Sequence, residues 1–279
     1  MQDRNRRRQQ FELERALRQE ILESPKEVRT SIVASAYEKL FAAFPDHSVF
    51  DASPEERHRK GRLSAEMVAP LLPKSSRVLE VGCGRGDTLT ALRVLGYDCI
   101  GVEPSIHMLN ICTESDTRVN VRFGTADKLD FPDNCFDGVF CQEVMEHLHP
   151  EDVPRFFVEA FRVLRHGGLL SVETPNRTTG PQDISRGFTA VAEGLHLKEW
   201  TVSELLDQFK AAGFEKVRGL LAPQFLARRY RPVHCLTRVP ARVKHLQDLL
   251  LRCVLWRDIR TLIGKLIGLD DIFLFGRKP

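Results

Sequence analysis

The chain has 279 residues, a length that suits one large domain or one domain with additions. Hydrophobic residues make up 42% and charged residues 28%, which is ordinary globular usage and excludes wholesale disorder and a collagen-like fibre. Lys and Arg number 41 against 38 Asp and Glu, so the net charge of +3 does not by itself indicate nucleic acid or a membrane as a partner.

The cysteines, the N-terminal residues and the apolar stretches indicate the cellular compartment of the protein. The seven cysteines form no C-x-x-C pair, which supports neither a disulfide framework nor a cysteine zinc site and fits a reducing compartment. Gln9, Gln10 and Glu12 stand where a signal peptide needs an apolar stretch. Charged residues interrupt the apolar stretches of residues 249–269, so no membrane-spanning segment is expected. We therefore expect a soluble, cytoplasmic protein.

Residues 1–75 are predicted to form an N-terminal helical segment that covers the active site. The first ten residues are expected to be a frayed, solvated tail. Apolar residues then recur at a spacing of four over residues 13–21 and 28–44, the period of one buried helical face. Ser24 and Ser53 each precede a proline and, three positions on, a glutamate, so each is predicted to cap a helix.

Residues 76–220 are predicted to form an α/β core. Short apolar runs alternate there with helix-length stretches, and they cover residues 78–81, 99–102, 119–123, 136–141 and 169–174. Buried strands separated by helices predict a mainly parallel, doubly wound sheet. A helix is predicted at residues 154–164, closed by Gly167 and Gly168, and a capping box at Thr201 opens another.

Residues 221–279 are predicted to form a basic amphipathic helical insertion and the final strand. Strands are expected at 217–220 and 272–275, the sixth and seventh of the sheet. Between Arg228 and Lys265 there are ten basic residues against two acidic ones, a balance of +8, with apolar residues and Trp256 interleaved. Such an element suits the surface of an anionic membrane or an acidic substrate, and equally a packed lid with a solvated basic face. RNA ranks third, because basic and aromatic residues do not alternate regularly.

The most informative stretch joins the first predicted strand to a helix through Gly82, Gly84 and Gly86. This pattern brings backbone close to a ligand and presents free N–H groups at a helix N-terminus, although it also occurs as plain tight packing. Glu103 ends the second strand roughly 20 residues further on, where an acid can accept hydrogen bonds from ribose hydroxyls. Asp87 occupies the position of the third glycine in a dinucleotide-binding motif. The glycine pattern therefore fits a dinucleotide-dependent oxidoreductase poorly.

These residues resemble the class I S-adenosylmethionine-dependent methyltransferases, whose signature is an acidic residue and then G-x-G-x-G after the first strand. The resemblance covers about residues 75–220, with further matches at 131–137, 146–148 and 164–168. It implies a Rossmann-like fold with a seven-stranded, mainly parallel sheet, N-terminal helices and a helical insertion before the last strand.

The resemblance also implies S-adenosyl-L-methionine as cofactor and a set of residues that bind it. These are Glu80, Gly82, Cys83, Gly84, Gly86, Glu103, Thr125, Ala126, Asp127 and Gln142. Many relatives carry Asp-Ala after the third strand for adenine, whereas this chain has Thr125-Ala126 with Asp127 beyond. Either Thr125 or Asp127 binds the exocyclic amine of adenine, or Asp127 only caps a helix.

Glu143, Glu146 and His147 follow the fourth strand as E-x-x-E-H. Together with His196 they are similar to magnesium-dependent members of the family, which makes Glu143, Glu146, His147 and His196 candidate ligands of Mg2+. A cation there would orient a hydroxyl and lower its pKa. Alternatively, His147 forms only a hydrogen bond with the backbone and thereby shapes the pocket. Without metal, His147 or His196 is the candidate general base, beside Glu146 in the catalytic set.

We interpret the chain as an S-adenosylmethionine-dependent methyltransferase that acts on oxygen of a small-molecule, lipid-like or saccharide acceptor. The alternatives are a metal-dependent RNA 2′-O-methyltransferase and a catalytically silent cofactor-binding protein of the same fold. Peripheral contact with an anionic membrane, at its inner face, is expected from the basic insertion. Nucleic acid is not expected as a partner.

Overall fold

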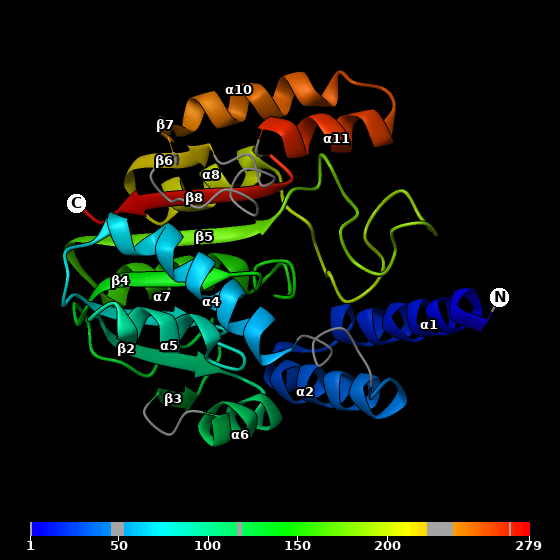
Figure 1. Cartoon of the computed structure of the whole chain (residues 1–279), viewed down its shortest axis with the longest axis horizontal. Coiled ribbons are helices and arrows are strands. Elements are labelled where there is room, and N and C mark those ends of the chain that lie inside the picture. The colour runs from blue at the N-terminus through cyan, green and yellow to red at the C-terminus, as the bar shows by residue number, and fades with distance from the viewer. Residues whose placement is uncertain (1, 46–52, 116–118, 222–236, 268) are drawn as a thin grey trace.

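A computed structural model describes residues 2–45, 53–115, 119–221, 237–267 and 269–279 of the chain. Within these residues one sheet runs through the molecule with helices on both faces (Figure 1). Its strands are β1 (Arg77–Val81), β2 (Asp98–Glu103), β3 (Asn120–Phe123), β4 (Phe136–Gln142), β5 (Leu164–Pro175), β6 (Glu215–Leu221), β7 (Thr237–Pro240) and β8 (Asp271–Arg277). The helices are α1 (Gln2–Leu22), α2 (Lys26–Ala43), α4 (Pro54–Val68), the 3-10 turn η1 (Ala69–Leu71), α5 (Asp87–Val94), α6 (Ile106–Ser115), α7 (Val153–Val163), α8 (Val202–Ala211), α10 (Ala241–Arg252) and α11 (Arg257–Ile267).

The strand order is β3-β2-β1-β4-β5-β8-β6-β7. Strands β1 to β5 are mutually parallel, and β8 is antiparallel to both of its neighbours, β5 and β6. Because β1 pairs with β2 on one side and β4 on the other, the chain reverses its winding direction there, and ligands bind at the carboxyl ends of such strands. The predicted doubly wound α/β fold is confirmed.

The strand count differs from the prediction by one. The described residues form eight strands, because β7 pairs antiparallel with the outer side of β6. This edge strand has four residues and ends at Pro240, so it carries too little hydrophobic alternation to be read as a strand.

Two hydrophobic clusters explain the continuous apolar runs of the strands. Leu79 points into a cluster with α7 and α8, where Phe157 and Phe209 lie 5.1 Å apart between ring centroids. Its neighbour Val78 points to the opposite face, into a cluster with α4 and α5. The central strands β1 and β4 are therefore buried on both faces, which is typical of a parallel sheet between helical layers.

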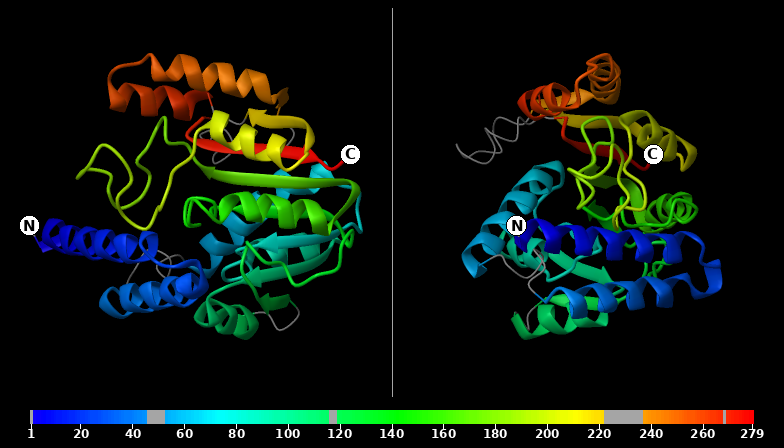
Figure 2. Two further views of the ribbon diagram at one scale, coloured as in Figure 1. Left: turned by 180° about the vertical axis from the view of Figure 1, so that it is seen from behind. Right: turned by 90° about the vertical axis from the view of Figure 1, so that its right-hand side faces the viewer.

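The helices α1 and α2 lie together beyond the carboxyl ends of the parallel strands (Figures 1 and 2). Their apolar residues, such as Leu17 and Leu40, form a third cluster with Leu195 and Leu197 from the loop before α8. The expected tail at residues 1–10 was wrong, since α1 begins at Gln2.

Four local predictions had different outcomes. Ser53 caps α4 by accepting from Glu56 N–H, and the capping box at Thr201 opens α8, as predicted. Ser24 does not cap α2, because its hydroxyl donates to the Ile21 carbonyl and Pro25 occupies the cap position. Gly167 and Gly168 do not close a helix; α7 ends at Val163 and both glycines lie within β5.

Candidate active site

The glycine turn follows β1 at the switch in winding direction. Gly82, Gly84 and Gly86 have φ values of 74°, 50° and 75°, the left-handed region in which glycine carries no Cβ penalty. A side chain at Gly82 would collide with Val144, and one at Gly86 with Cys112, whereas a Cβ at Gly84 would have no neighbour within 4 Å. The turn is therefore packed at both ends and open in the middle, where a ligand can approach the backbone.

Glu103 connects the end of β2 to this turn. Its carboxylate accepts from Gly84 N–H and from Ser105 N–H, each at 3.0 Å. Burial raises the pKa of Glu103, and these two backbone donors oppose the rise. The structure thus brings together the two features predicted to hold the methionine and ribose parts of a cofactor.

The side chains of Glu80 and Cys83 are both buried. Burial raises the pKa of Glu80 to about 8, although a hydrogen bond with Thr88 works the other way. The sulfur of Cys83 packs against Gly101 of β2, and burial raises the pKa of this thiol. Both side chains thus pack inside the fold, with the Cys83 thiol against β2 and the Glu80 carboxyl beside Thr88 of α5.

The residues predicted for adenine follow β3. Ala126 is buried in the core, while Thr125 and Asp127 are partly exposed in a turn that Lys128 N–H closes onto the Thr125 carbonyl at 3.3 Å. Gln142, at the end of β4, donates from its side chain to Glu173 at 2.8 Å. Thr125 and Asp127 both remain candidates for the adenine amine.

A cavity of about 800 Å³ lies between α2 and the segment that follows β2. Its wall is mixed: Tyr37 and Phe41 of α2 are aromatic, while Ser105 and His107 are polar. Since Ser105 is also bonded to Glu103, this cavity adjoins the predicted cofactor residues. The sequence predicted a packed apolar face for α2 and did not indicate that other residues of this helix, such as Tyr37 and Phe41, line a cavity.

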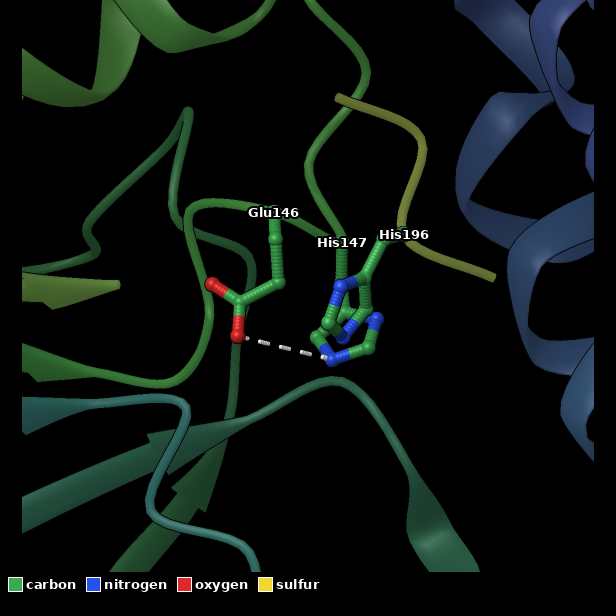
Figure 3. A group of neighbouring side chains, drawn as sticks. All are labelled: Glu146, His147 and His196. Carbon is green, nitrogen blue, oxygen red and sulfur yellow. Dashed lines mark ion pairs between the residues drawn. The ribbon is translucent and has the colours of Figure 1, made fainter. Parts of the chain in front are cut away.

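A cluster of three ionisable side chains lies at the same edge of the sheet (Figure 3). Glu146, His147 and His196 each offer a ligand atom, and these atoms lie within 4.8 Å of one another. The loop after β4 supplies Glu146 and His147, and the loop before α8 supplies His196. His147 Nε2 is 3.9 Å from Glu146 Oε1, and the two imidazole rings are 5.0 Å apart and nearly perpendicular.

Glu143, the fourth predicted metal ligand, is not part of this group. It has a left-handed φ of 52° and its backbone N–H donates to the Glu173 carbonyl. Burial of its carboxyl group and the charges of Glu146 and Asp271 raise the pKa of Glu143 well above the usual range.

His147 is held as a neutral imidazole. Its Nδ1 lies 3.0 Å from the Leu195 carbonyl and 3.1 Å from the Tyr37 hydroxyl. Burial and the nearby His196 lower the pKa of His147 to about 3. Because a carbonyl can only accept, Nδ1 carries the proton of the neutral ring, and the lone pair is assigned to Nε2.

The pKa of His196 is shifted in the opposite direction. Burial lowers its pKa, but the hydrogen bond from Nδ1 to Glu199 Oε1 at 3.0 Å and the charge of Glu146 outweigh burial, so the pKa is raised. Pairs of titratable groups whose pKa values are pushed apart are typical of acid and base sites. Glu199 and Tyr37 were missed by the sequence analysis. Only the spacing of three between His196 and Glu199 hinted at the first.

The chemistry of Glu146 tests whether the cluster suits a metal ion. Its Oε2 accepts from Thr174 Oγ1 at 2.8 Å, while its buried Oε1 has no hydrogen-bond partner among the described residues. Burial raises its pKa, and the charge of His196 opposes the rise. Two imidazoles and one carboxylate fit a transition-metal ion, whereas Mg2+ prefers oxygen ligands.

The strand order, with the antiparallel strand β8 between β5 and β6 and the glycine turn at the end of β1, defines a Rossmann-like methyltransferase fold. Residues 79–172 match the family model described as "Methyltransferase domain". This domain, together with the relatives described below, supports the class I S-adenosylmethionine-dependent methyltransferase family.

Known proteins support the same assignment. A probable S-adenosylmethionine-dependent methyltransferase of Mycolicibacterium smegmatis is 35% identical over 138 residues, which are 50% of this chain and 51% of that protein. The ubiquinone biosynthesis O-methyltransferase of Azorhizobium caulinodans is 33% identical over 167 residues, 54% of this chain and 62% of that protein. The chain thus spans about half to three fifths of these curated relatives.

Solved structures share the fold at low identity. A SAM-dependent methyltransferase from Archaeoglobus fulgidus matches with a TM-score of 0.58 at 20% identity, covering 84% of this chain and 99% of that one. A SAM-dependent methyltransferase and possible histamine N-methyltransferase from Thermotoga maritima matches with a TM-score of 0.53 at 21% identity, covering 88% of this chain and 95% of that one.

The helices of the described residues include none with the length and apolar character that a membrane span requires.

Proposed function

We propose that the protein transfers a methyl group from S-adenosylmethionine to oxygen of a small-molecule acceptor of lipid-like or saccharide character. The observation that carries the proposal is the neutral His147, whose unprotonated Nε2 faces Glu146 and His196 at the carboxyl edge of the sheet. An imidazole in this state is able to take the proton of a hydroxyl.

The residues of the turn are proposed to hold the cofactor. Backbone of Gly82 to Gly86 would bind its methionine part, Glu103 the ribose hydroxyls, and Thr125 or Asp127 the adenine amine. When bound, S-adenosylmethionine supplies a methyl group on a positively charged sulfur. The open side of Gly84 and its direct bond to Glu103 support this assignment.

The low pKa of His147 indicates when the proton leaves the acceptor. A base with a pKa of about 3 is too weak to ionise an ordinary hydroxyl beforehand. An oxygen that gains a methyl group while it still holds its proton becomes a strongly acidic oxonium. We infer that His147 Nε2 takes the proton as, or just after, the new carbon–oxygen bond forms, and that the protein's main task is alignment.

The position of the acceptor is proposed from the cavity between α2 and the residues after β2. Its size of about 800 Å³ suits a ligand pocket. Its wall combines aromatic and polar side chains, so it suits an acceptor that is partly apolar and carries hydroxyls. The name of the relative in ubiquinone biosynthesis supports oxygen as the atom that is methylated.

A metal-assisted reaction is the second candidate. Here Glu146, His147 and His196 would bind a divalent cation. The buried Oε1 of Glu146 without a partner among the described residues favours this candidate. A metal-dependent RNA 2′-O-methyltransferase is the form it would take with a nucleic acid acceptor. We propose a transition metal before Mg2+ because of the two nitrogen ligands.

Label transfer tests both candidates together. The protein is incubated with methyl-tritiated S-adenosylmethionine and a cell extract, with and without EDTA, and the label is followed into lipid, small aqueous, RNA and protein fractions. We expect label in the lipid or small aqueous fraction whether or not EDTA is present. Loss of that label with EDTA would support the metal, and label in RNA the nucleic acid acceptor. Cofactor binding without any label would favour a silent binding protein.

We also propose a cytoplasmic location at the inner face of the membrane. The basic, apolar C-terminal helices support this location.

A further inference from the structure

The C-terminal helix α10 has its polar and apolar sides reversed. Its inward face carries Lys244 and Asp248, both fully buried, beside Ala241 and Leu251. Its outward face carries leucines at positions 246, 249 and 250, all exposed. A helix of a soluble protein normally turns its apolar stripe toward the core, so this arrangement requires an explanation.

Buried polar contacts fix the orientation of α10. Asp248 accepts from Asn176 at 3.1 Å and from Arg252 at 2.6 Å. Lys244 lies against Gly219 of β6, within the influence of Asp270 and Asp271. Rotating the helix to bury its leucines would bring these paired charges into water and break the contacts with β5 and β6. The outward apolar face is therefore a fixed property of the fold.

The helix α11 and the turn before it continue this apolar face. Leu255 is 91% and Trp256 is 73% exposed in the turn, and α11 adds exposed residues at a spacing of three and four. We call the whole set the hairpin face; it comprises Leu246, Leu249, Leu250, Leu255, Trp256, Ile259, Leu262 and Leu266. Exposed apolar surface gathered on two helices marks a contact surface.

Basic residues accompany the hairpin face. Arg242 and Lys265 are exposed at the far ends of the two helices, and Arg252, Arg257 and Arg260 lie between them. Asp258 is the exposed acidic residue on α10 and α11, since Asp248 is buried. An anionic surface therefore complements this element. A second copy of the chain would place basic residues against basic residues, which opposes self-association.

The hairpin face also has a fixed position relative to the site. Both views place the turn between α10 and α11 beyond the carboxyl edge of the sheet, at the same end of the molecule as α1 and α2 (Figures 1 and 2). A surface bound through this turn would therefore lie at the end of the molecule that carries α1 and α2.

We propose that the hairpin face docks the protein on an anionic lipid bilayer. The leucines and Ile259 lie in the boundary between headgroups and acyl chains, Trp256 lies at headgroup level, and the basic residues bind lipid phosphates. The proposal concerns binding alone and does not depend on methyl transfer. It goes beyond the proposed reaction, and its partner is the lipid surface itself.

Trp256 provides a direct readout. The chain has two tryptophans, and Trp200 is buried while Trp256 is exposed. We expect vesicles of phosphatidylglycerol and phosphatidylcholine to shift tryptophan emission to the blue and to carry the protein into the pellet. Vesicles of phosphatidylcholine alone should do neither. In Trp256→Phe the emission shift should disappear while sedimentation persists, which would assign the shift to this residue.

Variants separate the apolar from the electrostatic part. Leu255→Ser with Ile259→Ser should weaken sedimentation at least about tenfold, because two inserted side chains are lost. Arg242→Gln with Lys265→Gln, or high salt, should weaken it by a similar factor. Val94→Ser, which changes an equally exposed apolar residue on α5, is the matched control and should bind like the unchanged protein.

Three results would overturn the proposal. One is no binding to anionic vesicles, and another is equal binding to neutral ones. The third is a concentration-dependent dimer in sedimentation velocity that Leu255→Ser abolishes, since this would assign the hairpin face to a second copy. Methyl transfer measured on a water-soluble acceptor should be unchanged in all hairpin variants, so failure of the reaction and failure of docking are distinguishable.

Discussion

The Tyr37 hydroxyl lies 3.1 Å from Nδ1 of His147. The first residue belongs to α2 and the second to the loop after β4, so a side chain of the N-terminal segment reaches the proposed base directly. Tyr37 also lines the cavity proposed for the acceptor. The helix α2 therefore contacts both the proposed base and the proposed acceptor cavity through Tyr37.

Tyr37→Phe tests this contact. The change removes the hydroxyl and keeps the ring, so the orientation of His147 then depends on the Leu195 carbonyl alone. We expect methyl transfer to fall about threefold to tenfold with little change in stability. Tyr97→Phe is the matched control, because its hydroxyl donates to the Ala69 carbonyl far from the site. Equal effects of both changes would argue against a role for Tyr37.

Two glycines of similar strain separate cofactor binding from backbone strain. Gly84 and Gly96 both have positive φ, and a Cβ on either would meet no atom within 4 Å. Alanine at each should lower the free energy of unfolding by about 1 kcal/mol. Only Gly84→Ala should also weaken binding of S-adenosylhomocysteine by calorimetry, at least about tenfold. Unchanged affinity in Gly84→Ala would remove the turn from the cofactor site.

Glu103→Ala extends that test to the ribose. The change removes the carboxylate that Gly84 and Ser105 N–H groups bind, and with it the proposed acceptor for two hydroxyls. We expect affinity for S-adenosylhomocysteine to fall about a hundredfold, in line with loss of charged hydrogen bonds. Retention of full affinity would show that Glu103 only supports the loop.

The pKa of His147 predicts how stability depends on pH. Its pKa is about 3 in the folded protein and 6.5 ordinarily, so between these values the folded state binds fewer protons than the unfolded state. The stability that this neutral imidazole contributes is present above pH 6.5 and is lost as pH falls toward 3. His147→Gln should therefore lose less stability than the unchanged protein between pH 7 and pH 5 in urea titrations. His58→Gln, at an exposed position, should behave like the unchanged protein.

Glu199 is predicted to raise the pKa of His196. Glu199→Gln removes a buried negative charge 3.0 Å from His196 Nδ1, so the pKa of His196 should fall. A proton-observed NMR titration of the imidazole measures this shift. Asp207→Asn removes one negative charge at an exposed position of α8 and should leave the titration unchanged. An unaltered midpoint in Glu199→Gln would mean that the charges of Glu146 and Asp183, and not Glu199, raise the pKa of His196.

The parts of the fold that were predicted depend on local patterns. The run from Val78 to Val81 and the three glycines after it identify a buried strand and a tight turn from sequence alone, because both depend on neighbouring residues. The strand β7 and the start of α1 depend on partners elsewhere in the fold. Phe11 is an example: it stacks on Phe188 with ring centroids 4.8 Å apart, a contact that no local pattern reveals.

The candidate site, like the fold, was predicted from the sequence only in part. His147 and His196 were named through the family resemblance, and the structure brings their rings to 5.0 Å. Tyr37 and Glu199 were not named, because the hydrogen bonds that connect them to the histidines form only when α2 and the loop before α8 reach the carboxyl edge of the sheet. The reversed polarity of α10 was also hidden, since a basic apolar pattern does not say which face is buried.

The central claim is methylation of oxygen, and the most direct measurement identifies the bond that is made. Carbon-13 methyl-labelled S-adenosylmethionine is incubated with extract and the protein, and the product is examined by NMR, with Glu103→Ala as the inactive control. The account predicts a methyl ether or ester signal that forms with the unchanged protein and not with the variant. Label bonded to nitrogen or carbon would contradict it, as would a methyl ether that forms equally with Glu103→Ala.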